Sequence, residues 1–184
     1  LNLLDAVKVR EWFSKNKPKI VIVAAAKVGG ILANFKNPVE FLLENIKIQN
    51  NLIENAYIFG VKRLLFLGSS CIYPKNCPQP IKEEYLLDGL LEKTNESYAI
   101  AKIAGIKLCE SLRIQNNFDS ICVMPTNLYG PGDNYHPENS HVMAALIRKF
   151  LIATRDSLPA VNCWGTGSPF REFMHVDDLG EGVV

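Results

Sequence analysis

A tyrosine and a lysine, Tyr98 and Lys102, stand four residues apart in a segment with helical character. In a helix this spacing places both side chains on one face, one turn apart. Because a neighbouring ammonium group stabilises a phenolate, we expect the pKa of Tyr98 to fall toward neutrality. Such a phenol can exchange a proton with a carbonyl or alcohol oxygen, as hydride-transfer chemistry requires. The same pair is also common on solvated helix faces, so the surrounding residues must decide between the two interpretations.

Hydroxyl and thiol groups follow an apolar run at Arg63 to Gly68, which predicts a buried strand. Ser69 and Ser70 can form an ordinary turn, but beside the tyrosine and lysine we favour a functional role. The Ser69 hydroxyl is our candidate for holding a reacting carbonyl against the phenol, and Lys102 can also donate to cofactor ribose hydroxyls. Cys71 stands just past the strand end, which makes it a candidate acid or base.

Buried strands and amphipathic helices alternate along the chain. An α/β doubly wound parallel sheet follows from that alternation, because parallel neighbours need crossover connections. The expected strands are Ile20 to Ala26, Arg63 to Gly68 and Ser120 to Met124, and the expected helices are Asp5 to Asn16, Pro38 to Phe59, 97–115 and a later one running to Ala153.

The carboxyl ends of parallel strands share one edge of a sheet, where ligands of open α/β folds bind. Three segments should therefore converge there: Ala24 to Gly30, Ser69 to Cys71 and Pro125 to Gly130. The helix that carries Tyr98 starts at the same edge. The separate candidate residues thus become one predicted site.

A histidine and several basic residues follow in the last third of the chain. His141 should lie in the first turn of a helix capped by Asn139 or Ser140, where a solvated side chain is the simplest reading. Arginine and lysine side chains can neutralise a diphosphate, although each alone would be an ordinary surface charge. These basic residues are Arg148, Lys149 and Arg171.

Composition excludes several classes of function. The formal net charge of +1 offers no electrostatic basis for binding nucleic acid or an anionic membrane surface. The run from Ile20 to Ala26 is too short to cross a bilayer, and no signal peptide opens the chain, so we expect a cytoplasmic protein. The five cysteines and three histidines lack disulfide or zinc-ligand spacing, so we expect neither disulfides nor a metal.

Several stretches, which together extend over nearly the whole chain, resemble the GDP-L-fucose synthase family of the extended short-chain dehydrogenase/reductase superfamily. The Tyr-x-x-x-Lys pair is typical of the superfamily, whereas Ser-Ser-Cys-Ile-Tyr-Pro and His-Pro-Glu-Asn-Ser-His are far narrower motifs. The stretches are Ala24 to Ile31, Phe66 to Pro74, Tyr98 to Glu110, Met124 to Gly130, His136 to Val142, Trp164 to Gly167 and Arg171 to Phe173.

This resemblance implies a reductase triad of Ser69, Tyr98 and Lys102, and an acid/base pair of Cys71 and His141. It implies NADPH-dependent epimerisation at C3 and C5 and reduction at C4 of GDP-4-keto-6-deoxy-D-mannose. Lys149, Trp164 and Arg171 match positions that face the GDP-sugar; the family usually has arginine at the first of these. The positions that match cofactor contacts are Leu67, Gly68, Ser69, Ser70, Lys102, Pro125, Thr126, Asn127, Leu128 and His141.

The glycine-rich loop of the first βαβ unit, which seats a cofactor pyrophosphate, is absent from the chain. We therefore expect residues 1–130 to form the C-terminal part of a Rossmann domain, and residues 131–184 to form part of a substrate-binding region and a return to the Rossmann domain. We read the chain as the middle of a longer protein, and expect it alone to bind NADPH weakly and to turn over nothing. The apolar surface of the helices at 38–59 and 97–115 favours a homodimer.

Two other functions compete with this interpretation. A 4-epimerase or 4,6-dehydratase of the same superfamily would share the fold, but dehydratases typically place an acidic pair where Ser70 and Cys71 stand here. A non-catalytic nucleotide-binding scaffold is also compatible with the fold. Such proteins commonly lose the tyrosine or the lysine, and this chain keeps both.

Overall fold

A computed structural model describes residues 1–184 as two compact units. The first unit comprises Leu1–Val28 and Asn34–Met124, and the second comprises Gly29–Ala33 and Pro125–Val184. Helix α2 (Ile31–Lys36) spans the boundary between these ranges. The units are described separately below, and the predicted domain boundary at residue 130 stays a prediction.

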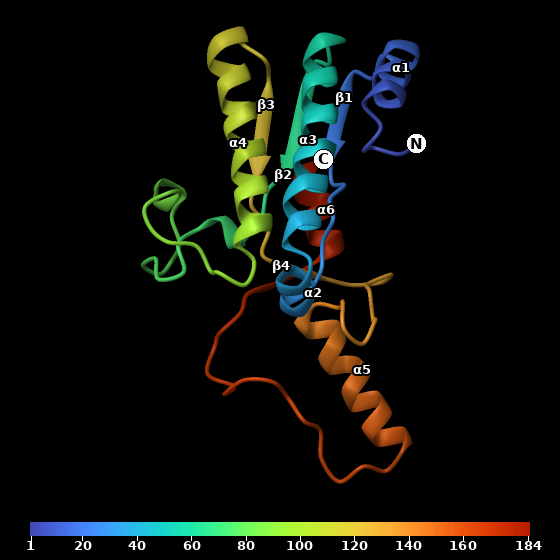
Figure 1. The fold of residues 1–184 in the computed structure, drawn as a ribbon, viewed down its shortest axis with the longest axis vertical. Coiled ribbons are helices and arrows are strands. Elements are labelled where there is room, and N and C mark those ends of the chain that lie inside the picture. The colour runs from blue at the N-terminus through green and yellow to red at the C-terminus, as the bar shows by residue number, and fades with distance from the viewer. The chain divides into compact units, whose positions relative to one another are not determined.

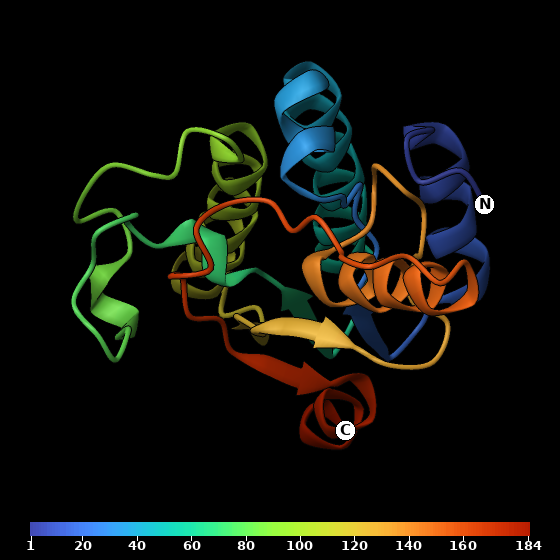
Figure 2. The same ribbon diagram turned by 90° about the horizontal axis from the view of Figure 1, so that it is seen from below.

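The first unit contains a parallel sheet in the order β1-β2-β3. Its strands are β1 (Ile20–Val23), β2 (Arg63–Leu67) and β3 (Ser120–Val123), and α3 (Pro38–Ile58) and α4 (Glu96–Asn116) connect them. Figure 2 shows these two helices and α1 (Ala6–Asn16) in one layer on one face of the sheet. The predicted Rossmann-like α/β fold is therefore confirmed.

Local sequence explains where these helices begin and end. The Asp5 side chain caps α1 by accepting a hydrogen bond from the Lys8 amide, and Lys17 ends it in the left-handed region with φ of 44°. Pro38 opens α3 at a position where a missing amide proton costs nothing. Asn117 ends α4 with φ of 53°.

The core of the first unit lies between the helix layer and the sheet. The largest fully buried apolar side chains come from both layers, and include Phe13, Phe66, Ile53, Leu64 and Val9. The strand β1 is an edge strand built only of isoleucine and valine, and its Ile20 and Ile22 side chains are 63% and 48% exposed. The described sheet is therefore covered on its helical face and exposed at Ile20 and Ile22 on the opposite face, and β1 pairs with another strand on one side only.

The expected strand at Ile20 to Ala26 was too long, because β1 ends at Val23. Beyond it, the amide and carbonyl of Lys27 bond to the Asn45 side chain of α3 at 2.8 and 3.0 Å instead of continuing the ladder. The expected ends of the other two strands were each one residue beyond the observed ends.

The second unit contains a short parallel pair, β4 (Asn127–Tyr129) with β5 (Phe173–His175). Helix α5 (Val142–Arg155) precedes β5, and α6 (Val176–Val183) follows it directly (Figure 1). The His175 side chain accepts a hydrogen bond from the Asp177 amide and so caps α6. Sequence patterns did not predict β4, β5, α2 or α6.

Candidate active site

Strand β2 and helix α4 bring four predicted site residues together in the first unit. Ser69 directly follows the end of β2 and caps a short 3-10 turn at Ser70–Ile72, which carries Cys71. Tyr98 and Lys102 occupy the first turns of α4. All four therefore lie at the carboxyl edge of the sheet, as the strand order predicted.

Lys102 is buried, with only 3% of its surface exposed. Its ammonium group donates to the Leu67 carbonyl at 2.8 Å, and lies 4.7 Å from the centre of the Phe66 ring and 5.8 Å from that of Tyr98. Burial lowers the pKa of Lys102 to about 8, although the nearby Cys71 thiol opposes this change. The Lys102 ammonium group therefore loses its proton at a lower pH than an exposed lysine does.

The expectation that Lys102 would lower the pKa of Tyr98 toward neutrality was wrong for this structure. Burial and the neighbouring Cys71 raise the pKa of Tyr98, while a hydrogen bond with the Ser69 side chain lowers it slightly. Burial of the phenol is the main cause, and the Lys102 ammonium group, which donates to the Leu67 carbonyl at the end of β2, does not offset it. Tyr98 is therefore a proton donor in this arrangement rather than a phenolate.

A thiol and a hydroxyl are in direct contact beside this phenol. The Sγ of Cys71 donates to the Oγ of Ser69 at 3.2 Å, and the Cys71 amide approaches the same oxygen at 3.5 Å. Burial raises the pKa of the Cys71 thiol, which the Ser69 hydrogen bond partly offsets. One small region thus holds a thiol, a hydroxyl, a phenol and an ammonium group.

The packing of the ring of Tyr98 depends on α3. Phe41 meets that ring edge-to-face, with centroids 6.4 Å apart. Asn45, one turn further along α3, is buried and fixes the Lys27 backbone after β1. Sequence reasoning assigned neither residue to the site, and the signal available was a polar Asn45 within an otherwise apolar helix face.

Of the positions that match cofactor contacts, Leu67, Gly68, Ser69, Ser70 and Lys102 lie in the first unit, and Gly68 donates its amide to the Val123 carbonyl at 2.8 Å. Pro125 to Leu128 lie in the second unit, where Asn127 bonds to the Glu172 carbonyl. Thr126 has a buried hydroxyl with no hydrogen-bond partner. Such an orphaned group fits a contact to a polar ligand.

His141 also belongs to the second unit. It is the N-cap residue of α5, is exposed, and makes no side-chain capping bond. The predicted caps Asn139 and Ser140 were therefore wrong, because α5 begins later, at Val142. The exposed imidazole of His141 therefore does not cap α5.

Two of the three expected substrate contacts lie together. Lys149 of α5 places its ammonium group 5.1 Å from the centre of the Trp164 ring and donates to the Asn162 carbonyl at 2.9 Å. Trp164 is 72% exposed. Arg171 is exposed and donates to the adjacent Phe170 carbonyl.

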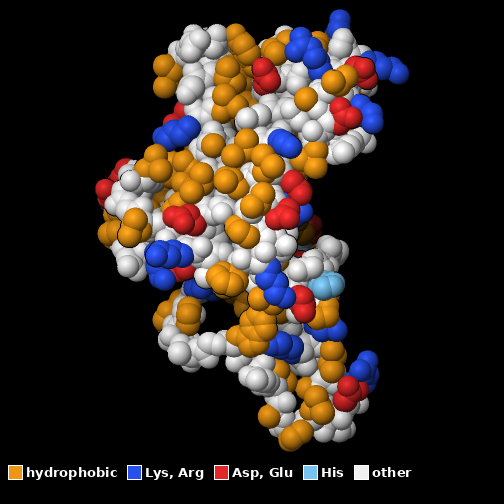
Figure 3. Space-filling model, viewed as in Figure 1, with side chains coloured by type: hydrophobic (Ala, Val, Ile, Leu, Met, Phe, Trp, Pro, Cys, Tyr) orange, Lys and Arg blue, Asp and Glu red, His pale blue; other side chains and the backbone are white.

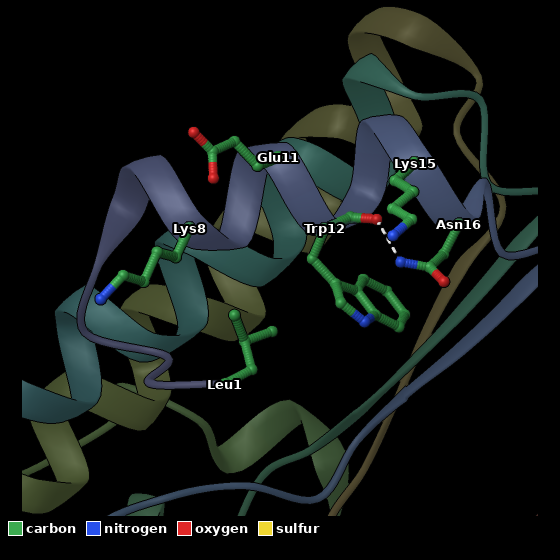
Figure 4. A pocket seen from close by; sticks show the side chains of 6 residues that line it. All are labelled: Leu1, Lys8, Glu11, Trp12, Lys15 and Asn16. Atoms are coloured by element: carbon green, nitrogen blue, oxygen red, sulfur yellow. Dashed lines mark hydrogen bonds between the residues drawn. The ribbon is translucent and has the colours of Figure 1, made fainter.

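Two hollows of the first unit contain none of these residues. One, of about 460 Å³, lies along α1 and is lined by Leu1, Lys8, Glu11, Trp12, Lys15 and Asn16 (Figure 4). The other, of about 350 Å³, lies between α1 and β1 and is mostly apolar. No group of three or more acidic, histidine or cysteine side chains is placed to hold a metal, and no helix has the length and apolar character to cross a membrane.

Known proteins resemble the chain over its full length. GDP-L-fucose synthase 1 of Arabidopsis thaliana is 59% identical over all 184 residues, which cover 57% of that protein. GDP-L-fucose synthase of Escherichia coli is 56% identical, again over the whole chain and 57% of its own length. A GDP-L-fucose synthetase from Naegleria fowleri bound to NADP has a similar structure, with 32% identity and a TM-score of 0.87 over the whole chain and 60% of the solved one.

The chain thus spans a little over half the length of these relatives. The family model described as the NAD dependent epimerase/dehydratase family matches residues 1–184. The matched residues therefore include the parallel sheet and the helix that carries the Tyr-x-x-x-Lys pair at its carboxyl edge. The chain belongs to the NAD dependent epimerase/dehydratase family.

Proposed function

We propose that this chain carries the reductase and epimerase residues of an enzyme that converts GDP-4-keto-6-deoxy-D-mannose to GDP-L-fucose with NADPH. The observation that carries the proposal is the contact of the Cys71 thiol with the Ser69 hydroxyl beside Tyr98. Two chemically different proton donors in one site suit an enzyme that moves protons at both carbon and oxygen. Relatives named GDP-L-fucose synthase support the same substrate.

Ser69 and Tyr98 would act on the oxygen at C4 of the sugar. The Ser69 hydroxyl would hold this oxygen against the phenol, and Tyr98, protonated because burial raises its pKa, would donate its proton as the ketone is reduced. NADPH, when bound, supplies the hydride. The ammonium group of Lys102 is held at the end of β2. It would keep a positive charge beside the phenol and would contact the cofactor ribose.

Cys71 and His141 would serve as the acid/base pair for epimerisation. The C4 ketone acidifies the hydrogens on both neighbouring carbons, so one pair of groups can invert C3 and C5 before reduction. The Cys71 thiol must first give up its proton to solvent; as a thiolate it would then take the carbon-bound proton, and the exposed His141 side chain would return a proton to the carbon. Reduction then fixes the inverted stereochemistry.

Binding groups for the remaining parts of the substrate and cofactor are available. The Lys149 ammonium group and the Trp164 ring would contact the GDP portion, together with Arg171. Pro125 to Leu128 and Leu67 to Ser70 would contact NADPH, with the unpartnered Thr126 hydroxyl as the clearest available group. The solved Naegleria fowleri relative bound to NADP supports this choice of cofactor.

The direct test incubates the full-length protein that carries this chain with GDP-4-keto-6-deoxy-D-mannose and NADPH. We expect consumption of NADPH and a product that NMR identifies as GDP-L-fucose. Omission of NADPH in D₂O should still give deuterium at C3 and C5. No NADPH consumption contradicts the proposal, and a reduced product that keeps the original configuration at C3 and C5 would identify a simple 4-ketoreductase instead.

We also propose a homodimer formed through α3 and α4. Figure 3 shows hydrophobic side chains gathered over these helices, and Val39, Leu43 and Ile100 are exposed. Light scattering should give twice the protomer mass, and Ile100→Glu should shift the protein toward monomer. A monomeric wild type contradicts the dimer. The expected cytoplasmic location stays a prediction.

A further inference from the structure

A buried glutamine links the two helices that flank the proposed site. Gln49 of α3 is 2% exposed, and its Nε2 donates to the Ala101 carbonyl of α4 at 2.7 Å. Ala101 directly precedes Lys102 and lies one turn after Tyr98. The bond therefore attaches α3 to the turn of α4 that carries both residues.

The absence of a side chain at Gly105 of α4 makes this bond possible. Gly105 lies one turn after Ala101, and a Cβ atom at Gly105 would stand 2.9 Å from Cδ of Gln49 and 2.6 Å from Cζ of Phe66. Any side chain at this position would push the carboxamide away from the carbonyl. The same glycine lets α4 pack closely against the Phe66 ring. The centre of this ring lies 4.7 Å from the Lys102 ammonium group.

The remaining contacts between α3 and α4 do not fix the register so strictly. Phe41 meets Tyr98 near the start of both helices, and Tyr57 accepts a hydrogen bond from Asn116 near their ends. The first is an adaptable ring contact, and the second is exposed. Gln49 makes the one buried side-chain hydrogen bond that we find between the two helices, and a buried polar bond of this kind selects one register.

Stability alone does not account for Gln49. Its Oε1 atom is buried without a hydrogen-bond partner, and burying an unpaired carbonyl costs free energy. An apolar side chain of similar shape would avoid that cost. The carboxamide therefore has a role other than packing. Its contact is with the Ala101 carbonyl, in the turn of α4 that carries Tyr98 and Lys102.

We propose that Gln49 is a positioning residue, which holds Tyr98 and Lys102 in their working places by fixing the register of α4 through the Ala101 carbonyl. The inference rests on the proposed reductase function. Gln49 itself does not touch substrate or cofactor in this assignment. Its effect should appear in reduction, which uses α4, and not in epimerisation, whose thiol is carried by the turn after β2.

The test compares Gln49→Met with wild type in the full-length protein. Reduction should fall about 10-fold to 100-fold, since small misplacements of catalytic groups have effects of this size. Deuterium exchange at C3 and C5 should stay close to the wild-type rate, because Cys71 lies on the turn after β2 and not on α4. Gln49→Glu should retain reduction at mildly acid pH, where its buried carboxyl is protonated and can donate to Ala101 as the amide does.

Asn55→Leu is the matched control, because Asn55 is another buried amide of α3 but bonds only within its own helix, to the Asn51 carbonyl at 2.7 Å. This control should leave the ratio of reduction to exchange unchanged. The proposal is overturned if Gln49→Met reduces at the wild-type rate, if exchange falls in proportion to reduction, or if Gln49→Glu is as impaired as Gln49→Met at mildly acid pH.

Crystal structures of wild type and Gln49→Met give a readout that does not depend on activity. We expect the bond from Lys102 Nζ to the Leu67 carbonyl to lengthen beyond its 2.8 Å. An unmoved α4 would overturn the proposal even in an active enzyme. Failure of the wild type to turn over the substrate would instead overturn the proposed function, and the structures would still decide the role of Gln49.

Discussion

The Sγ of Cys71 lies 3.2 Å from the Oγ of Ser69, so the thiol and the hydroxyl share one hydrogen bond. The shared bond would couple the two halves of the proposed reaction, because we assign Ser69 to the reductase triad and Cys71 to the epimerase pair. While Cys71 donates to Ser69, the hydroxyl can donate in turn to a substrate oxygen. Loss of the thiol proton would leave a nearby anion that opposes ionisation of Tyr98.

Replacement of Tyr98 by phenylalanine should separate reduction from epimerisation. The variant keeps the ring that packs against Phe41 but loses the proton donor. We expect reduction to fall by about 10²-fold to 10⁴-fold, while exchange at C3 and C5 continues. NADPH oxidation and deuterium incorporation, measured by NMR in the same preparation, check the separation. Unchanged reduction would remove the tyrosine from the mechanism.

Replacement of Cys71 by serine should have the opposite effect on exchange. A serine hydroxyl is a far weaker acid, so exchange at C3 and C5 should fall by about 10²-fold or more. Because burial raises the pKa of Cys71 above its usual 9.0, wild-type exchange should increase roughly tenfold per pH unit below that pKa. The measurement is the exchange rate against pH. A rate that decreases with pH would contradict the role of Cys71 as base.

Lys102 should make stability depend on pH in a defined window. Its pKa is lowered from 10.5 to about 8 on folding, so between these values the unfolded chain binds more protons than the folded one. Stability of the wild type should therefore rise with pH across this window, by about 3 kcal/mol at most. Lys102→Met should lack this increase and should also lose reduction. Urea denaturation at several pH values checks both proteins.

Equal pH dependence in the two proteins would show that Lys102 does not titrate in this range. Lys102→Arg is a useful companion variant, because it keeps a charge that cannot be lost. The larger guanidinium group would have to fit between the Leu67 carbonyl and the Phe66 ring. We expect it to destabilise the fold at every pH.

Replacement of Gly105 by alanine should destabilise the protein, although alanine is about 1 kcal/mol more favourable than glycine in the interior of a helix. The new methyl group would overlap Phe66 and Gln49, and overpacking of this kind costs about 1 to 3 kcal/mol. We expect a net loss of up to about 2 kcal/mol by denaturation. Gly180→Ala is the matched control, since that helical glycine has open space around it, and this variant should not destabilise.

Much of the fold could be predicted because its strands are continuous apolar runs and its helices are long. The strands β4 and β5 could not, since three residues are too few to show a pattern. Spacing correctly placed Tyr98 and Lys102 on one face, but it could not show that the Leu67 carbonyl holds the ammonium group. Gln49 escaped notice because a glutamine in an amphipathic helix ordinarily faces solvent.

The exposed outer side of β1 has a practical consequence for anyone who prepares these 184 residues in isolation. A short strand of isoleucine and valine with unpaired backbone groups is a template for other strands, and nothing on it, such as a lysine or a proline, discourages such pairing. Aggregation in concentrated solution should begin there. Ile22→Lys would interrupt this apolar run and should improve solubility.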